Sequence, residues 1–276
     1  MKNLSLCLFY LFAVALTRAS SAQTPPNYRK AIPANQVYHY AWTTAKWRGD
    51  DKPYYTVRMQ IVSALRSGKS FDALIDSYEN RYRQNPKDNL SLFGWACAIV
   101  YPRILHLRSH MDFYSVPYTT QLENLLRAFD GSKPPCTYEF MRMRYLAVEQ
   151  SSDRNDYTTA LGERLAAQDK NDFDVIYYVG SDISKNTPGA KEKSLGYARR
   201  LIELDPNRGT GYGLMADRYY YHWGLYGMNP EDARQSIHWD GEYLKHENRT
   251  GSEFDRGRET SRLSIIKLQK WLAAHK

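Results

Sequence analysis

Apolar residues recur at three- and four-residue spacing through most of the chain, which is the period of α-helices with one buried face. Residues 193–221 show this pattern most clearly. The rhythm breaks at Asp205-Pro206-Asn207, because a proline cannot extend a helix and biases the preceding residue away from helical angles. The stretch predicts two helices joined by a sharp corner, with buried positions at Leu195, Ala198, Leu201 and Ile202 before it and Tyr212, Met215, Ala216 and Tyr219 after it.

The same periodicity predicts five consecutive helix pairs and a last helix. Thr187-Pro188 and Asn229-Pro230 mark two of the starts, because each places a capping residue before a proline in the first turn. Segment 102–117 exceeds the usual helix connection of about 2–8 residues, so we expect a surface excursion there. The predicted pairs are 54–66 with 70–84, 88–101 with 118–129, 137–149 with 154–167, 173–185 with 188–204, and 208–222 with 230–246, followed by 253–275.

One sequence signature recurs in the first helix of each predicted pair. A large residue is followed, after two residues of any kind, by a second large residue and directly by a small one. After two further residues of any kind comes a last large residue. Besides Tyr212-Met215-Ala216-Tyr219, it is complete at Leu92-Trp95-Ala96-Ile99 and Ile176-Val179-Gly180-Ile183. Two weaker copies, Met59-Val62-Ser63 and Met143-Leu146-Ala147, lack the last large apolar residue. The small residues fall at positions 63, 96, 147, 180 and 216, which are 33, 51, 33 and 36 residues apart. Three of these steps are close to the period of about 34 residues of a helical repeat, and segment 102–117 lengthens the fourth.

This signature, together with Leu-Ile-Glu-Leu-Asp-Pro-Asn at 201–207, resembles the tetratricopeptide repeat (TPR). The resemblance covers about residues 54–250. It implies an all-α, right-handed α-solenoid of about five helix-turn-helix pairs, with a capping helix at 251–276. The sequence departs from the family pattern in one respect, because only two repeats carry the corner proline, at Pro86 and Pro206.

The resemblance also implies a binding groove, because the first helix of each TPR pair lines the inner face of the solenoid. The TPR proteins that clamp carboxylates use Lys and Asn at set groove positions, and this sequence lacks them. The alternative is that the aromatic members pack between helices or against the N-terminal arm. Transferred position by position, the groove residues are Phe93, Tyr101, Arg144, Tyr177, Ser181, Lys185, Asp217 and Tyr221.

Residues 1–22 have the pattern of a secretory signal peptide, with Lys2, an apolar run at 4–16 and small residues ending at Ala22. We therefore expect an exported protein, periplasmic or secreted, cleaved near Ala22. Residues 23–53 form an arm with four prolines and five large aromatic rings. Because such rings are costly to leave in water, we expect part of this arm to lie against the helices.

The net charge of +8 falls to +6 once Lys2 and Arg18 are removed with the signal peptide. Acidic and basic residues alternate in most predicted helices, without the continuous basic stripe of a nucleic-acid-binding protein. No later segment approaches the ~18 apolar residues of a membrane-spanning helix. A protein or peptide, with acidic ones as candidates, is the partner that this pattern favours.

Candidate chemistry is sparse. His106 and His110 stand four apart, a spacing that suits zinc on a helix, but neither the glutamate of a metalloprotease motif nor a third ligand accompanies them. Asp182 and Asp217 are candidates for a hydrolytic acid pair. Export would permit a disulfide, yet the expected helix positions favour two free buried thiols at Cys97 and Cys136.

These patterns predict an exported, non-catalytic interaction module, a scaffold or assembly factor, that needs no cofactor. The alternative is an exported hydrolase or carbohydrate-binding protein with a tyrosine-rich groove. The sequence does not identify the partner, and it does not decide whether the groove or segment 102–117 binds it.

Overall fold

The computed structural model describes residues 50–107, 116–132, 137–151, 156–182 and 189–275. All of them belong to one structural unit, Tyr38–Lys276. The predicted signal peptide and nearly all of the arm at 23–53 lie outside the described residues, as do His110, Cys136 and Lys185.

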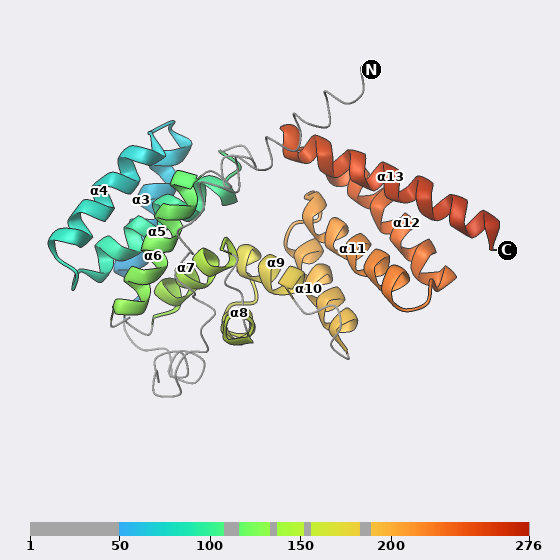
Figure 1. Cartoon of the computed structure of the whole chain (residues 1–276), viewed down its shortest axis with the longest axis horizontal. Helices are drawn as coiled ribbons and strands as arrows, with labels where there is room; N and C mark the ends of the chain where they lie inside the picture. The colour runs from blue at the N-terminus through green and yellow to red at the C-terminus, as the bar shows by residue number, and fades with distance from the viewer. Residues whose placement is uncertain (1–49, 108–115, 133–136, 152–155, 183–188, 276) are drawn as a thin grey trace, which may run out of the picture. The chain divides into compact units, whose positions relative to one another are not determined.

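The described residues form eleven α-helices and no strand, which confirms the all-α fold and the predicted succession of helices (Figure 1). The helices are α3 Lys52–Arg66, α4 Phe71–Gln84, α5 Asn89–Ile104, α6 Val116–Gly131, α7 Tyr138–Glu149, α8 Asp156–Gln168, α9 Phe173–Asp182, α10 Ala190–Leu204, α11 Gly209–Leu225, α12 Pro230–His246 and α13 Ser252–Ala274.

Several helices begin at a capping side chain. Asp88 Oδ1 accepts hydrogen bonds from the amides of Leu90 and Ser91 at 3.0 and 3.1 Å. Asn229 Oδ1 accepts from the Glu231 amide at 2.9 Å, directly before the proline that opens α12. These bonds satisfy amides that have no partner inside the helix, which is why the chain turns helical at these points.

From α4 onward each helix packs against the next one in the chain, whereas α3 packs on α5, and α5 also contacts α7. Residues 91–102 of α5 are buried on every side, as its nearly all-apolar sequence predicts. Aromatic rings join the helices around it: Tyr54 lies edge-on to Phe93 and Phe140, with ring centres 5.1 and 5.7 Å away. The hydrophobic core of the described residues is therefore centred on α5 and α7.

The small repeat positions at Ala96, Ala147, Gly180 and Ala216 are all buried. A Cβ atom at Gly180 would lie 2.8 Å from Leu214 Cδ2 and 2.9 Å from Tyr197 Cβ, so α9 approaches both α10 and α11 through this residue. This contact supports the predicted repeat at α9.

The predicted register is wrong in the first repeat. Ser63 is exposed, and Met59, its expected apolar neighbour, is also exposed. Helix α3 buries Tyr54, Ile61, Val62 and Leu65 instead. The face that lies on α5 is therefore rotated from the one that the weak signature indicated.

The predicted excursion also begins too early. Helix α5 continues through Pro102 to Ile104, because a proline near a helix end removes only one amide donor. The Tyr101 carbonyl accepts from the Leu105 amide at 2.8 Å, and Ile104 and Leu105 pack against the core. Residues 108–115 lie outside the described part of the chain.

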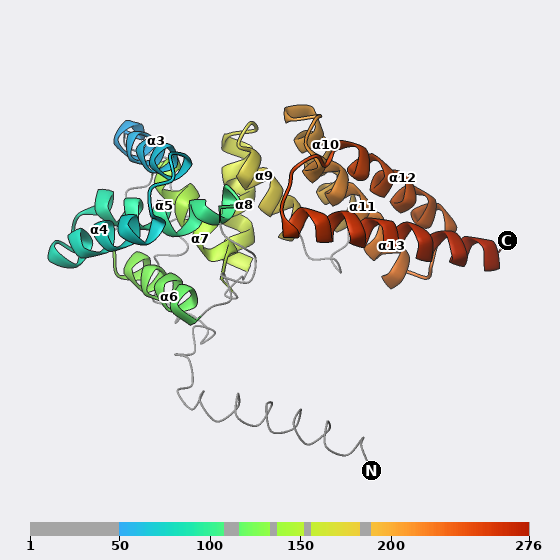
Figure 2. The ribbon, with the colours of Figure 1, turned by 90° about the horizontal axis from the view of Figure 1, so that it is seen from above.

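The last three helices have a small cluster of their own, made by Trp223, Ala233 and Leu268. Figure 2 shows α11, α12 and α13 side by side, as their contacts require. Helix α13 buries only Phe254, Ser261 and Leu268. None of the described helices is long and apolar enough to cross a membrane.

Candidate functional site: a cavity with two charged ends

A cavity of 640 Å³ lies beside the first helices of the last repeats. Its walls come from α9, α11 and α13, from α12, and from the end of α5 with the residues just after it. The charged or aromatic residues that line it are Arg103, His106, Phe173, Asp174, Tyr177, Tyr178, Arg208, Asp217, Asp240, Tyr243, Glu247, Arg249, Glu253, Phe254 and Arg256.

Side-chain contacts show how the helices run past this cavity. Arg208, just before α11, lies over Phe173 at the start of α9, and Gly180 near the end of α9 meets Leu214 in the middle of α11. Arg249, just before α13, reaches Thr210 in the first turn of α11. The starts of α9, α11 and α13 therefore converge at one end of the cavity, which we call the arginine end.

Two stacked guanidinium groups form the arginine end. The Arg208 guanidinium lies 4.2 Å from the ring centre of Phe173, and that of Arg249 lies 4.2 Å from the ring centre of Phe254. Both donate to Thr210 Oγ1, Arg208 Nε at 3.1 Å and Arg249 Nη2 at 3.2 Å. Stacking on rings fixes the planes of both groups and leaves their edges for hydrogen bonding.

The carboxylates at this end have cationic or histidine partners. Glu247 accepts from Arg249 Nε at 2.8 Å, Glu253 pairs with His106, and Asp174 accepts from Arg142 Nη2 at 2.8 Å. Arg208, in contrast, makes no ion pair with a carboxylate of the described residues. Burial, and next the repulsion of Arg249, lower the pKa of Arg208. Arg208 is thus a half-buried positive charge that a hydroxyl and a ring hold in place.

The backbone adds to this positive potential. Arg208 and Gly251 are the N-cap residues of α11 and α13, and neither supplies a side-chain hydrogen bond to the first turn of its helix. Uncapped first-turn amides carry a partial positive charge and favour anions.

The other end of the cavity is acidic. Asp240 of α12 is only 6% exposed, and its carboxylate accepts from the hydroxyls of Ser261 and Ser264 on α13. It forms no ion pair with a described cation, and burial raises its pKa. Asp217 of α11 lines the same cavity and is exposed.

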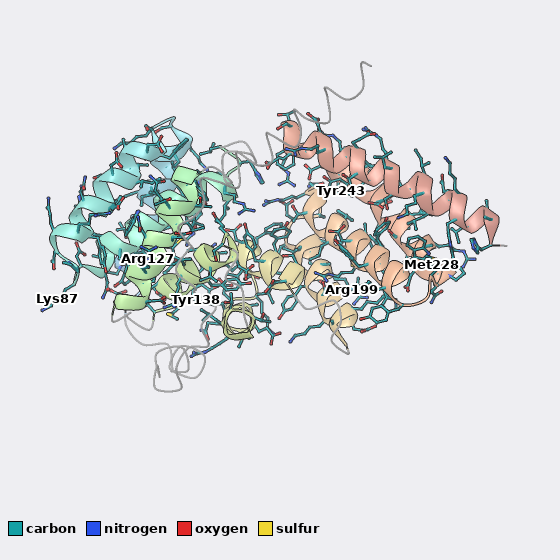
Figure 3. The ribbon with its side chains drawn as sticks, in the orientation of Figure 1. Lys87, Arg127, Tyr138, Arg199, Met228 and Tyr243 are labelled. Carbon is teal, nitrogen blue, oxygen red and sulfur yellow. The ribbon has the colours of Figure 1, made fainter. Side chains whose placement is uncertain are left out.

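Tyrosines line the wall between the two ends. Tyr177 and Tyr178 lie edge to face on α9, with ring centres 5.2 Å apart. Tyr243, labelled in Figure 3, passes between two glycines: a Cβ at Gly213 would lie 3.2 Å from its ring, and one at Gly257 would lie 2.5 Å from its hydroxyl oxygen. Burial, and next the charge of Glu247, raise the pKa of Tyr243 to about 12, so its hydroxyl stays protonated at neutral pH.

The structure brings three of the predicted groove residues together, since Tyr177, Ser181 and Asp217 all line this cavity. Tyr221, one turn beyond Asp217, is 40% exposed and lines a much smaller cavity with His222. The binding role of all four residues stays a prediction.

Phe93, Tyr101 and Arg144 do not face an open groove, so their expected exposure is wrong. Phe93 and Tyr101 are core residues, and the Tyr101 hydroxyl accepts from Arg142 Nη1 at 2.7 Å. Arg144 is 6% exposed and donates to Asp130 Oδ1 at 2.8 Å. The reason is that neighbouring helices pack around α5 and α7, which leaves these positions without access to solvent.

His106 is exposed just after α5, as a surface segment predicts, but it also contacts α13. It stacks edge-on against Phe254, with ring centres 4.7 Å apart, and pairs with Glu253. No group of three or more potential metal ligands occurs in the part of the chain that the structure describes. Cys97 is a buried free thiol, and burial raises its pKa.

The repeat pattern in the sequence did not point to Arg208, Arg249, Asp240 or Tyr243. Arg208 lies at the start of a first helix, Arg249 precedes the capping helix, and Asp240 and Tyr243 belong to a second helix; the pattern assigns none of these places to the groove.

The chain matches no protein-family model, no curated protein and no solved structure.

Proposed function

We propose that this protein is a non-catalytic interaction module that binds an anionic segment of a protein or peptide in the 640 Å³ cavity. The observation that carries this proposal is Arg208, a half-buried guanidinium stacked on Phe173 without a carboxylate partner among the described residues. A carboxylate at its free edge would form charge-assisted hydrogen bonds.

Three further features support this proposal. The cavity volume falls within the usual range of about 300–1,000 Å³ for ligand sites. Tyr177, Tyr178 and Tyr243 offer flat amphipathic contact area, and tyrosine and arginine are enriched among the residues that dominate binding energy. The hydrogen bond to Thr210 holds Arg208 in place before a ligand arrives, and Glu247 does the same for Arg249. Because these side chains are already ordered, the entropic cost of binding is lower.

In this proposal the module is exported after cleavage near Ala22 and acts as a scaffold or assembly factor with TPR-like repeats. The support for export is the pattern of residues 1–22, and the support for the repeats is the recurring small residue.

The second candidate is a carbohydrate-binding protein or hydrolase. Asp217 and Asp240 line one cavity, and the raised pKa of Asp240 is the property of a general acid. This candidate predicts that sugars, rather than acidic peptides, occupy the tyrosine-lined wall.

A peptide array tests the proposal even though the natural partner is unidentified. The wild type, Arg208→Gln and Arg199→Gln would be applied to an array of random hexapeptides with blocked ends. Arg199 is the matched control, because it is an exposed arginine on α10 that does not line the cavity (Figure 3).

We expect peptides rich in Asp and Glu to be retained by the wild type and by Arg199→Gln. Arg208→Gln should retain them at least ~10-fold more weakly, which corresponds to about 1.4 kcal/mol. The proposal fails if the array shows no preference for acidic residues, or if Arg208→Gln and Arg199→Gln behave alike.

A further inference from the structure

The acidic end of the cavity is not needed to bind an anion, and it calls for an explanation of its own. Asp240 is a buried carboxylate with hydroxyl partners and no ion pair with a described cation. A buried charge without an opposite charge is costly, and in proteins such a group is usually paired or placed where a ligand supplies the partner.

Two arginines near this end in the sequence make hydrogen bonds outside it. Arg218, one residue after Asp217, points its guanidinium at the carbonyls of Gly180 and Ser181, with Nη2 at 3.0 Å from the first. Arg249 is held by Glu247 at the arginine end. Asp240 of α12 and Asp217 of α11 both line this end of the cavity.

The two ends are separated by a length that a short peptide can span. Asp240 of α12 and Glu247, the residue just after this helix, lie about two turns apart, or roughly 10 Å along the helix axis. Thr210 and Asp217 are spaced in the same way on α11. Side chains three residues apart on an extended peptide are separated by a similar distance, because each residue spans up to about 3.4 Å.

We propose that the cavity recognises a dipolar peptide segment, with an acidic side chain at Arg208 and a lysine or arginine, about three residues away, at Asp240 and Asp217. This inference rests on the proposed function and adds the second charge to it. The tyrosines between the two ends contact the intervening residues. The basic side chain supplies a counter-ion for Asp240, just as the acidic one neutralises Arg208.

Synthetic tetrapeptides with blocked ends test this inference directly. The dipolar probe is acetyl-Glu-Tyr-Leu-Lys-amide. The anionic probe carries Gln in place of Lys, and the cationic probe carries Gln in place of Glu. Each is titrated in both chain directions, because the cavity does not fix the direction of the peptide, and the tighter orientation is compared.

We expect the wild type to bind the dipolar probe at least ~10-fold more tightly than the anionic probe. Asp240→Asn should bind the two equally, while the control Asp76→Asn, at an exposed position on α4, should keep the preference. Thermal melting of each variant shows that it is folded. The comparison of probes on the wild type needs no variant, so it stands even if Asp240→Asn unfolds.

The outcomes separate this inference from the proposed function. Equal binding of the dipolar and anionic probes, with both weakened by Arg208→Gln, overturns the dipolar ligand and leaves the anionic module standing. Binding of the cationic probe alone overturns the proposed function. Failure of all three probes to bind more tightly than about 1 mM overturns both.

Discussion

Arg144 and Arg208 show how differently two arginines of one chain can be used. Both lose much of their contact with water, but Arg144 gains a carboxylate partner in Asp130, whereas Arg208 gains a ring and a hydroxyl. Burial lowers the pKa of Arg144 to about 9 and also lowers that of Arg208. Arg144 therefore contributes to the stability of the fold, and we assign Arg208 to binding.

Arg144→Glu should destabilise the protein by at least ~3 kcal/mol, because it buries a carboxylate beside Asp130 without a cation. Arg208→Gln should change the free energy of unfolding by less than about 1 kcal/mol, since it removes no ion pair. Urea unfolding followed by circular dichroism measures both. Equal stability of Arg144→Glu and the wild type would contradict the burial of Arg144.

The raised pKa of Asp240 predicts how the stability of the protein changes with pH. Because burial raises its pKa above the usual 3.8, the folded state holds this proton at pH values where the unfolded state has lost it. Stability is therefore lost as pH rises through the window between 3.8 and the raised pKa. Asp240→Asn lacks this loss, so it should be more stable than the wild type at pH 7, and the difference should shrink toward pH 4.

Urea unfolding of the wild type and Asp240→Asn at pH 4 and pH 7 measures this difference. A variant that is less stable than the wild type at pH 7 would show that the charged carboxylate is satisfied within the protein.

At the scale of helices, most of the fold is readable from the sequence, because the burial period and the capping residues are local. Asp88, Thr137 and Asn229 all cap the helices that follow them. The register of α3 was not readable, since its weak signature offered Met59 and Ser63 where packing chose Ile61 and Leu65.

The site was only partly readable for a different reason. Tyr177, Ser181 and Asp217 follow from the position of first helices, which is again a periodic property. The stacking of Arg208 on Phe173 and the placement of Asp240 depend on side chains far apart in the sequence. No local pattern records such a contact.

The close approach of α9 to its neighbours gives a prediction for glycine. Gly180→Ala should destabilise by about 1–3 kcal/mol, because the added Cβ meets Leu214 and Tyr197 below 3.0 Å. Gly196→Ala on α10 is the control: its Cβ would meet nothing within 4 Å, and alanine favours a helix by up to about 1 kcal/mol. Opposite signs in thermal melting are expected, and two stabilising changes would place Gly180 away from the packed interface.

At the scale of the whole described chain, stability should be uneven. The main core is centred on α5 and α7, whereas α13 is held by the small cluster of Trp223, Ala233 and Leu268. Regions with few buried apolar contacts open at lower free energy than the core.

Hydrogen exchange should therefore be slowest in α5 and α7 and faster in α13. Leu268→Ala should accelerate exchange in α13 strongly, since truncation of a buried leucine costs about 2–5 kcal/mol. Exchange in α5 should change far less. A uniform acceleration across all helices would instead show that the described residues unfold as one cooperative unit.

The cavity depends on this arrangement as a whole, because its walls combine α9, α11, α12, α13 and the end of α5. The central claim is that Arg208 holds the anionic group of a peptide there. A crystal structure of the protein with acetyl-Glu-Tyr-Leu-Gln-amide tests it most directly. We expect the glutamate carboxylate to lie about 2.7–2.9 Å from the Arg208 guanidinium. A peptide bound with its carboxylate elsewhere, and Arg208 still without a partner, would contradict the claim.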